Sequence, residues 1–199
     1  MNLTERQIKS IQAKIQRIKK ALADDKKHWG GQYHDGRGLR YLPPEQYLKL
    51  QDYSGAQRYF NWFHKNFPDD SGYPDFLFEW TITLFYCGKL KEAEKKAITT
   101  HLSNQYYFDK YFNKPIVRLE KRHYSNLEYQ EMAESFAYTS TQEHLAEFTK
   151  WLEQFVKSDK FTTIVTQYNE LEEQLSKESD VPRRSKMINQ MHKIKYSEE

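Results

Sequence analysis

The chain has 199 residues, a length that fits one domain with a substantial buried core or two small domains. Only 38% of the residues are hydrophobic but 16% are aromatic, so we expect a core of bulky rings. The net charge of +3 argues against a specialised nucleic-acid-binding protein, and the single cysteine, Cys87, excludes an internal disulfide. The sequence lacks the run of ~18 apolar residues that a membrane span needs, so we predict a soluble, cytoplasmic protein.

Charge is distributed unevenly along the chain. Residues 1–27 contain eight Lys or Arg and three Asp or Glu, a net +5, and residues 181–199 contain five and two, a net +3. The middle of the chain is correspondingly acidic, with a net −5. Two interpretations stay open: the basic ends pack on the acidic middle, or they form an arm that binds a polyanion.

The N-terminal segment, residues 1–27, predicts a basic amphipathic helix. Thr4 and Gln7 have the spacing of a capping box. Behind them, apolar residues recur three and four apart, the pattern of a helix seam: Ile8, Ile11, Ile15, Ile18 and Leu22. We expect this seam to pack on another helix of the chain or to form a homodimer.

Residues 28–44 predict an irregular loop that holds four of the seven glycines. Its aromatic side chains, among them Trp29 and Tyr41, indicate that the loop packs against neighbouring helices. Long loops often carry function, so a small-ligand site or an active site, if the protein has one, is expected here. Such a site would use the polar residues of the loop: His28, His34, Asp35 and Arg37.

Residues 45–102 predict four helices in two hairpins. A short helix over 45–52 precedes one over 55–67, for which Ser54 is the expected N-cap. The helix after Pro74 is apolar on nearly every side, which predicts burial, and Gly88 is the expected stop signal. The following helix, over 89–102, is amphipathic.

The spacing within these hairpins resembles a repeat family. Ala56, Phe60 and Pro68 supply the landmarks A-x3-F…P, and Ala93 and Ala97 repeat the first two after 37 residues. Residues 41–102 are therefore similar to tetratricopeptide repeats, although the tryptophan and tyrosine positions of that family are not matched. The resemblance implies antiparallel helical hairpins in a right-handed array, with a concave surface for a peptide or protein. A generic helical hairpin protein is the alternative.

The remainder of the chain predicts more helices, over 104–115, 127–138, 142–157 and 160–176. Capping boxes at Ser125 and Ser140 are expected to open the second and third of these. The last carries an acidic seam that we expect to pair with the basic seam of residues 8–22. Residues 179–199 predict a short basic amphipathic helix, and the whole chain, 1–199, is expected to form a single all-α domain.

Motifs of known chemistry are missing. The sequence contains no HExxH, CxxC or GxxxxGK[ST] pattern, so we expect no catalytic residue, metal or cofactor. Cys87 lies in the most apolar predicted helix, where a thiol stays protonated. A non-enzymatic adaptor that binds a protein or peptide is the function we expect, with nucleic acid not expected as a partner. Its contact residues are predicted from polarity and aromaticity near the hairpins: Tyr33, Arg37, Arg40, Asn61, Lys65 and Tyr107.

Overall fold

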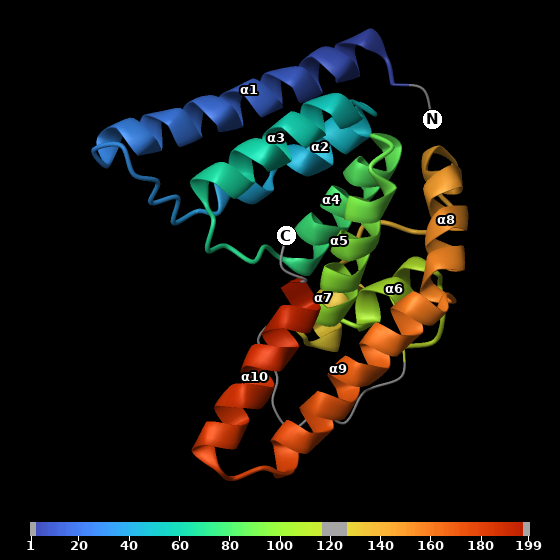
Figure 1. The fold of residues 1–199 in the computed structure, drawn as a ribbon. Coiled ribbons are helices and arrows are strands. Elements are labelled where there is room, and N and C mark those ends of the chain that lie inside the picture. Colours follow the sequence, from blue (N-terminus) through green and yellow to red (C-terminus); the bar gives the residue numbers. More distant parts are fainter. Residues whose placement is uncertain (1–2, 117–126, 197–199) are drawn as a thin grey trace. The chain divides into compact units, whose positions relative to one another are not determined.

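A computed structural model describes residues 3–116 and 127–196 (Figure 1). The regular secondary structure of these two segments consists of helices alone, which confirms the all-α prediction. The chain divides into two compact units, Met1–Leu90 and Lys91–Glu199. The expectation of one domain over 1–199 stays a prediction. Within the described segments, none of the helices combines the length and apolarity needed to cross a bilayer.

The described residues of unit 1 form four α-helices and one 3₁₀ turn, before α5 (Leu90–Ser103) begins at the last residue of the unit. They are α1 (Glu5–His28), η1 (Leu39–Tyr41), α2 (Pro43–Lys49), α3 (Tyr53–Asn66) and α4 (Pro74–Tyr86). Helix α2 packs on α1, α3 and α4, and α3 also packs on α4. The expected helices over 45–52 and 55–67 thus correspond to α2 and α3.

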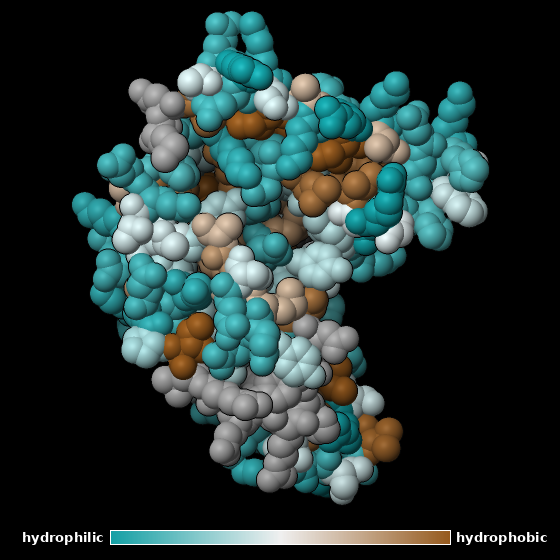
Figure 2. All heavy atoms as spheres, turned by 180° about the vertical axis from the view of Figure 1, so that it is seen from behind, coloured by the Kyte–Doolittle hydropathy of each residue, from teal (hydrophilic) through white to brown (hydrophobic). Residues whose placement is uncertain are grey.

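Helix α1 begins with the predicted capping box, in which the Thr4 hydroxyl accepts from the Gln7 amide and Gln7 accepts in return. Its seam faces the interior of unit 1, because Ile15, Ile18 and Leu22 are all buried. In the upper part of Figure 2, where α1 runs, hydrophilic side chains cover the outer edge and hydrophobic ones lie beneath them. The seam packs within this unit, and the proposed homodimer stays a prediction.

The core of unit 1 is aromatic, as the composition predicts. Ala56, Phe60, Phe63 and Phe76 form its buried centre, and half-buried rings pack around it, including Tyr41, Tyr47, Trp62, Phe67 and Trp80. Phe60 stacks on Trp80 with ring centroids 4.7 Å apart. Helices α3 and α4 contribute most of these rings, so their packing is the main hydrophobic contact of the unit.

The two ends of the α3–α4 region test the predicted caps. Helix α3 begins at Tyr53, and its N-cap is Asp52, whose carboxylate accepts from the Gly55 amide. The prediction of Ser54 as the cap is therefore wrong by two residues. Helix α4 ends at Tyr86, and Gly88 follows as the predicted stop signal, with a φ of +73° and with the Lys89 amide donating to the Leu84 carbonyl in a Schellman motif.

Unit 2 begins within α5 (Leu90–Ser103) and continues with α6 (Tyr106–Tyr111), α7 (Gln130–Glu134), η2 (Glu143–Leu145), α8 (Ala146–Val156), α9 (Asp159–Lys177) and α10 (Val181–Tyr196). Helix α9 packs on α8 and α10. The seam predicted over 160–176 thus has α10 as a partner inside its own unit.

Three of the predicted boundaries in unit 2 differ from the structure. The helix expected over 127–138 is confined to α7, and its supposed cap, Ser125, lies outside the described residues. The helix expected over 142–157 starts as the 3₁₀ turn η2, so the predicted cap at Ser140 is wrong. Helix α6 ends at Tyr111, four residues before Pro115.

Helices α2, α3, α4 and α5 overlap the four segments of residues 45–102 in which the sequence pattern predicts helices. Helix α2 has only 7 residues, which is short for the first helix of such a hairpin. The right-handed repeat array itself stays a prediction.

Candidate functional site

A groove of about 820 Å³ runs between α1 and the pair α2–α3 of unit 1. Its first wall belongs to α1 and consists of Gln12, Ile15, Gln16, Lys19, Leu22 and Ala23. The rest of its lining comes from the loop and from α2, α3 and their connection: Tyr33, Tyr47, Leu50, Asp52, Gly55, Arg58, Tyr59 and Trp62. This volume lies within the range of ~300–1,000 Å³ that ligand sites usually have.

A line of aromatic rings follows the groove. The centroids of Tyr47 and Tyr59 are 6.3 Å apart, those of Tyr59 and Trp62 are 5.1 Å apart, and those of Trp62 and Tyr33 are 5.5 Å apart. Tyr59 is buried, whereas the other three are half-buried and keep part of each ring accessible. Tyr33, Tyr47 and Trp62 therefore leave apolar ring surface that a ligand side chain can contact.

The hydroxyl groups of these tyrosines are neutral donors at physiological pH. Burial raises the pKa of Tyr33 and of Tyr59 above the ordinary value, and burial followed by the charge of Asp52 does the same for the pKa of Tyr47. The Tyr59 hydroxyl is already used, since it donates to the Arg40 carbonyl at 2.8 Å. Tyr33 and Tyr47 supply the phenol groups at the groove surface.

Gly55 allows Tyr47 to lie against the first turn of α3. A Cβ atom on Gly55 would lie 2.7 Å from Cε1 of Tyr47 and would also collide with the Asp52 carboxylate. The glycine therefore keeps both the N-cap of α3 and one ring of the groove in place. Its lack of a side chain matters here for space, because its backbone is that of an ordinary helix.

The charges at the groove are unequal. Lys19 on α1 and Arg58 on α3 are both exposed, and neither forms an ion pair with an acidic side chain in residues 3–116 or 127–196. Asp52 is the acidic residue of the lining, and its carboxylate is used as the N-cap of α3. The groove thus presents two unpaired cations, one on each side.

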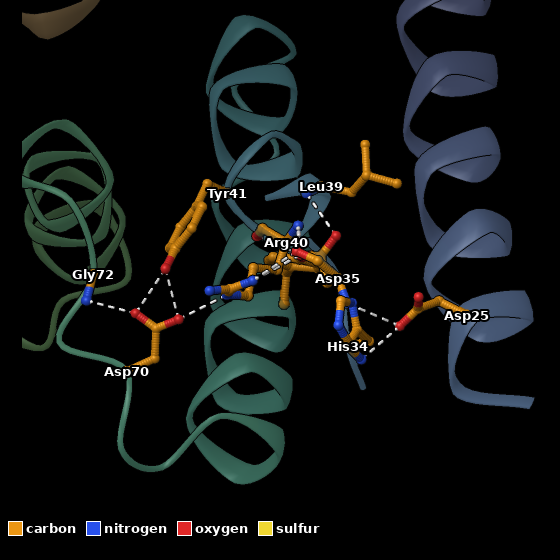
Figure 3. Close-up of polar contacts among 9 residues, drawn as sticks. Asp25, His34, Asp35, Leu39, Arg40, Tyr41, Asp70 and Gly72 are labelled. Atoms are coloured by element: carbon orange, nitrogen blue, oxygen red, sulfur yellow. Dashed lines mark hydrogen bonds and ion pairs between the residues drawn. The ribbon is translucent and has the colours of Figure 1, made fainter. Parts of the chain in front are cut away.

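The loop of residues 29–42 is held in place by a polar clamp around Arg40 (Figure 3). The Arg40 guanidinium donates to the Asp35 carboxylate at 3.0 Å and to the Asp70 carboxylate at 2.7 Å. Asp35 also accepts from the backbone amides of Leu39 and Arg40. Burial alone would lower the pKa of Arg40, but the hydrogen bonds that Arg40 donates to Asp70 and Asp35 outweigh it and raise the pKa.

The far side of the clamp fixes the connection after α3. The Tyr41 hydroxyl and the Gly72 amide both donate to Asp70. Burial, reinforced by the hydrogen bond to Asp70, raises the pKa of Tyr41, so this hydroxyl stays a donor. The clamp consequently joins η1 to the turn between α3 and α4, two segments thirty residues apart.

The loop is also tied to α1. The Asp25 carboxylate accepts from the backbone amides of Asp35 and His34, and these hydrogen bonds lower its pKa. Lys26 lies over the ring of Tyr33, with Nζ 4.8 Å from the centroid. Together with the Arg40 clamp, these contacts hold Tyr33 at the groove.

The predicted contact residues fall in different places. Tyr33 lines the groove, and Arg37 is exposed in the loop. Arg40 is an internal clamp residue with 20% of its side chain exposed, which argues against it as a partner contact. Tyr107 is 2% exposed in unit 2, with its hydroxyl directed at the Met132 carbonyl, so it offers no surface.

Asn61 and Lys65 are exposed on α3 but do not line the groove. Asn61 accepts a hydrogen bond from Gln57 at 2.9 Å. These two residues therefore stay predictions for a contact outside the groove.

The alternative small-ligand site in the loop stays a prediction. His34 stacks on Trp29 at 4.9 Å and His28 meets the edge of the same ring at 5.1 Å, while Asp35 is committed to the clamp. Across the described residues, no three His, Cys, Asp or Glu side chains converge as metal ligands would.

Sequence reasoning missed most of the groove. Lys19, Arg58 and Trp62 were not singled out, because each lies beside a helix face that already had an explanation as core. A signal was present on α3, where Tyr59 and Trp62 are three apart and form a second aromatic stripe beside Ala56 and Phe60.

No family model, no curated protein and no solved structure matches the chain.

Proposed function

We propose that this protein is a non-enzymatic interaction module whose unit 1 groove binds an extended segment of a protein partner. The observation that carries the proposal is the line of aromatic rings from Tyr47 to Tyr33 inside a groove open to solvent. Half-buried aromatic rings are typical anchors of protein recognition, because they offer a large contact area at little entropic cost. The resemblance to tetratricopeptide repeats points to the same class of partner.

The length of the groove suits a short extended peptide. Its α1 wall runs from Gln12 to Ala23, eleven residues apart, or about 17 Å at 1.5 Å per residue. An extended chain rises about 3.3 Å per residue, so about five residues would fill this length. The side-chain amides of Gln12 and Gln16 can donate to and accept from the backbone of such a segment.

The proposal is tested by obstructing the groove without touching the core. Ala23 is exposed on α1 and lines the groove, so Ala23→Trp would place an indole in the space that a peptide needs. We expect peptides selected by the wild-type chain from a random displayed library to bind with micromolar Kd. The variant should bind them at least about tenfold more weakly, a loss of about 1.4 kcal/mol.

The matched control is Ala13→Trp. Ala13 is exposed on the same helix, ten residues earlier, and is not part of the groove lining. Its variant should retain wild-type Kd values, and both variants should keep the wild-type Tm. Failure to select any peptide, or equal losses in the two variants, would refute binding in the groove.

A further inference from the structure

We infer that the groove selects acidic segments: peptides that carry Asp or Glu on either side of an apolar or aromatic anchor residue. This inference rests on the proposed function and adds the chemistry of the partner. It follows from the placement of charge in the groove, where the two charged side chains of the described lining that lack an ion-pair partner or a capping role, Lys19 and Arg58, are both cationic.

The two cations stand on opposite elements. Lys19 projects from α1 and Arg58 from α3, and both side chains are exposed beside the aromatic line. In the described part of the chain neither has an acidic partner, so a carboxylate of a ligand would displace no existing ion pair. Two carboxylates flanking an anchor residue would meet one cation on each wall.

The acidic groups close to the groove do not oppose such a ligand strongly. Asp52 is neutralised in part by the Gly55 amide and the positive end of the α3 dipole. Asp25, which lies near Tyr33 and accepts the amides of His34 and Asp35, is accompanied by Lys26 over the same tyrosine ring. The balance of charge around the groove therefore favours an anionic ligand over a cationic one.

An acidic peptide fits this groove better than a single-stranded nucleic acid. The aromatic rings could stack on bases, and the cations could contact phosphates. Only two unpaired cations line the described groove, however, whereas a nucleic acid that crosses it would bring a phosphate for every nucleotide. An oligonucleotide thus becomes one arm of the test.

The first experiment tests whether the negative charge of the peptide contributes to binding. Full-length protein is used to select peptides from a random displayed library, and the Kd of the best peptide is measured against versions with each Asp or Glu replaced by the amide. We expect enrichment of acidic residues and a roughly two- to fivefold weaker Kd for each replaced carboxylate, the range of partly exposed ion pairs. The effect should shrink as salt is raised from 50 to 500 mM.

The double variant Lys19→Glu/Arg58→Glu should lose the acidic peptide and prefer its Lys-substituted counterpart. Arg17→Glu/Lys20→Glu is the control, since it makes the same change of net charge on exposed α1 residues outside the groove. It should leave the preference unchanged. Circular dichroism melts would confirm that both variants are folded.

The outcomes separate the two claims. Peptides that bind and are lost in Ala23→Trp, but show no acidic enrichment and no response to Lys19→Glu/Arg58→Glu, would overturn the inference and keep the proposed function. A tighter affinity for a poly(U) oligonucleotide that is also lost in Ala23→Trp would overturn both. The absence of any peptide binding would refute the proposed function itself.

Discussion

Arg40 joins three parts of unit 1, two through its guanidinium group and one through its backbone carbonyl. It contacts Asp35 in the loop and Asp70 beyond α3, while its backbone carbonyl accepts from Tyr59 on α3. The side chains of Asp35 and Asp70 are 2% and 16% exposed, so water can replace little of what Arg40 provides. A charge pair with so little solvent contact is costly to break from one side, because the remaining carboxylates stay buried.

The two arginines of the loop make a direct comparison. Arg40→Ala should lower the free energy of unfolding by about 2–4 kcal/mol, because it leaves two poorly solvated carboxylates without their cation. Arg37→Ala removes an exposed side chain from the same loop and should stay within about 0.5 kcal/mol of wild type. Urea denaturation followed by circular dichroism measures both, and equal effects would contradict the clamp.

The role of Arg40 in the clamp was not visible in the sequence, where Arg40, like Arg37, was predicted to contact a partner. The loop was correctly expected to pack, because Tyr33 and Tyr41 are too apolar to stay in water. The partner of Arg40, however, is an aspartate thirty residues away. Only the packing of α2, α3 and α4 brings these two residues together, and no local spacing records it.

At the scale of the elements, the first turn of α3 shows which of two candidate N-cap residues, two positions apart, caps the helix. Asp52 and Ser54 are both favoured N-caps, and the sequence placed Ser54 in that position because Gln57 completes a box. The structure uses Asp52, whose carboxylate reaches the Gly55 amide at 2.8 Å. Ser54 is instead an exposed residue inside the first turn.

This assignment predicts that two small substitutions change the free energy of unfolding by different amounts. Asp52→Ala removes the cap and should lower the free energy of unfolding by about 1 kcal/mol. Ser54→Ala removes an exposed hydroxyl and should change it by less than about 0.5 kcal/mol. Thermal melts at matched concentration would decide between them, and a larger loss for Ser54→Ala would restore the original cap.

Elements with a long, regular period were predicted well, and those with short or interrupted patterns were not. Helices α1 and α9 follow their apolar seams closely, since burial on one face fixes a helix over many turns. Helix α7 is shorter than its capping pattern suggested, and η2 replaces the first turn expected before α8. In these places local propensity is weak and the tertiary environment determines the backbone.

For the whole molecule, the seam of α1 bears on the oligomeric state. Ile15, Ile18 and Leu22 are 3%, 8% and 1% exposed inside unit 1, which leaves only the half-buried Ile8 and Ile11 for a second copy. Two side chains fall well short of the area that stable dimers bury, about 800 Å² on each partner. A homodimer through this seam would require α1 to leave its unit.

We therefore expect no dimer through this seam, and sedimentation equilibrium tests it against the mass of one chain, 24.1 kDa. The measurement should be repeated with Ile8→Asp/Ile11→Asp, which removes the remaining accessible part of the seam. A species of twice the mass in wild type that disappears in this variant would instead support the dimer.

The groove could not be predicted from the sequence, because it forms only when separate helices pack together. Its walls come from α1 and α3, which are separated by the loop and α2, and each wall looks like an ordinary polar helix face in the sequence. Tyr33 was predicted as a contact residue because it is aromatic and near the hairpins, and it lines the groove. Lys19 and Arg58 become candidate contact residues only because the packing of α1 on α2 places them in the lining of the same groove.

The placement of the tryptophans gives the chain a built-in optical reporter. Trp62 lies in the groove, whereas Trp29 is 51% exposed at the end of α1 and stacks on His34 with ring centroids 4.9 Å apart. A ligand that covers Trp62 removes water from that indole and moves its emission to shorter wavelength. Occupancy of the groove can thus be followed in the unlabelled protein, with Trp62→Phe as the silent reference.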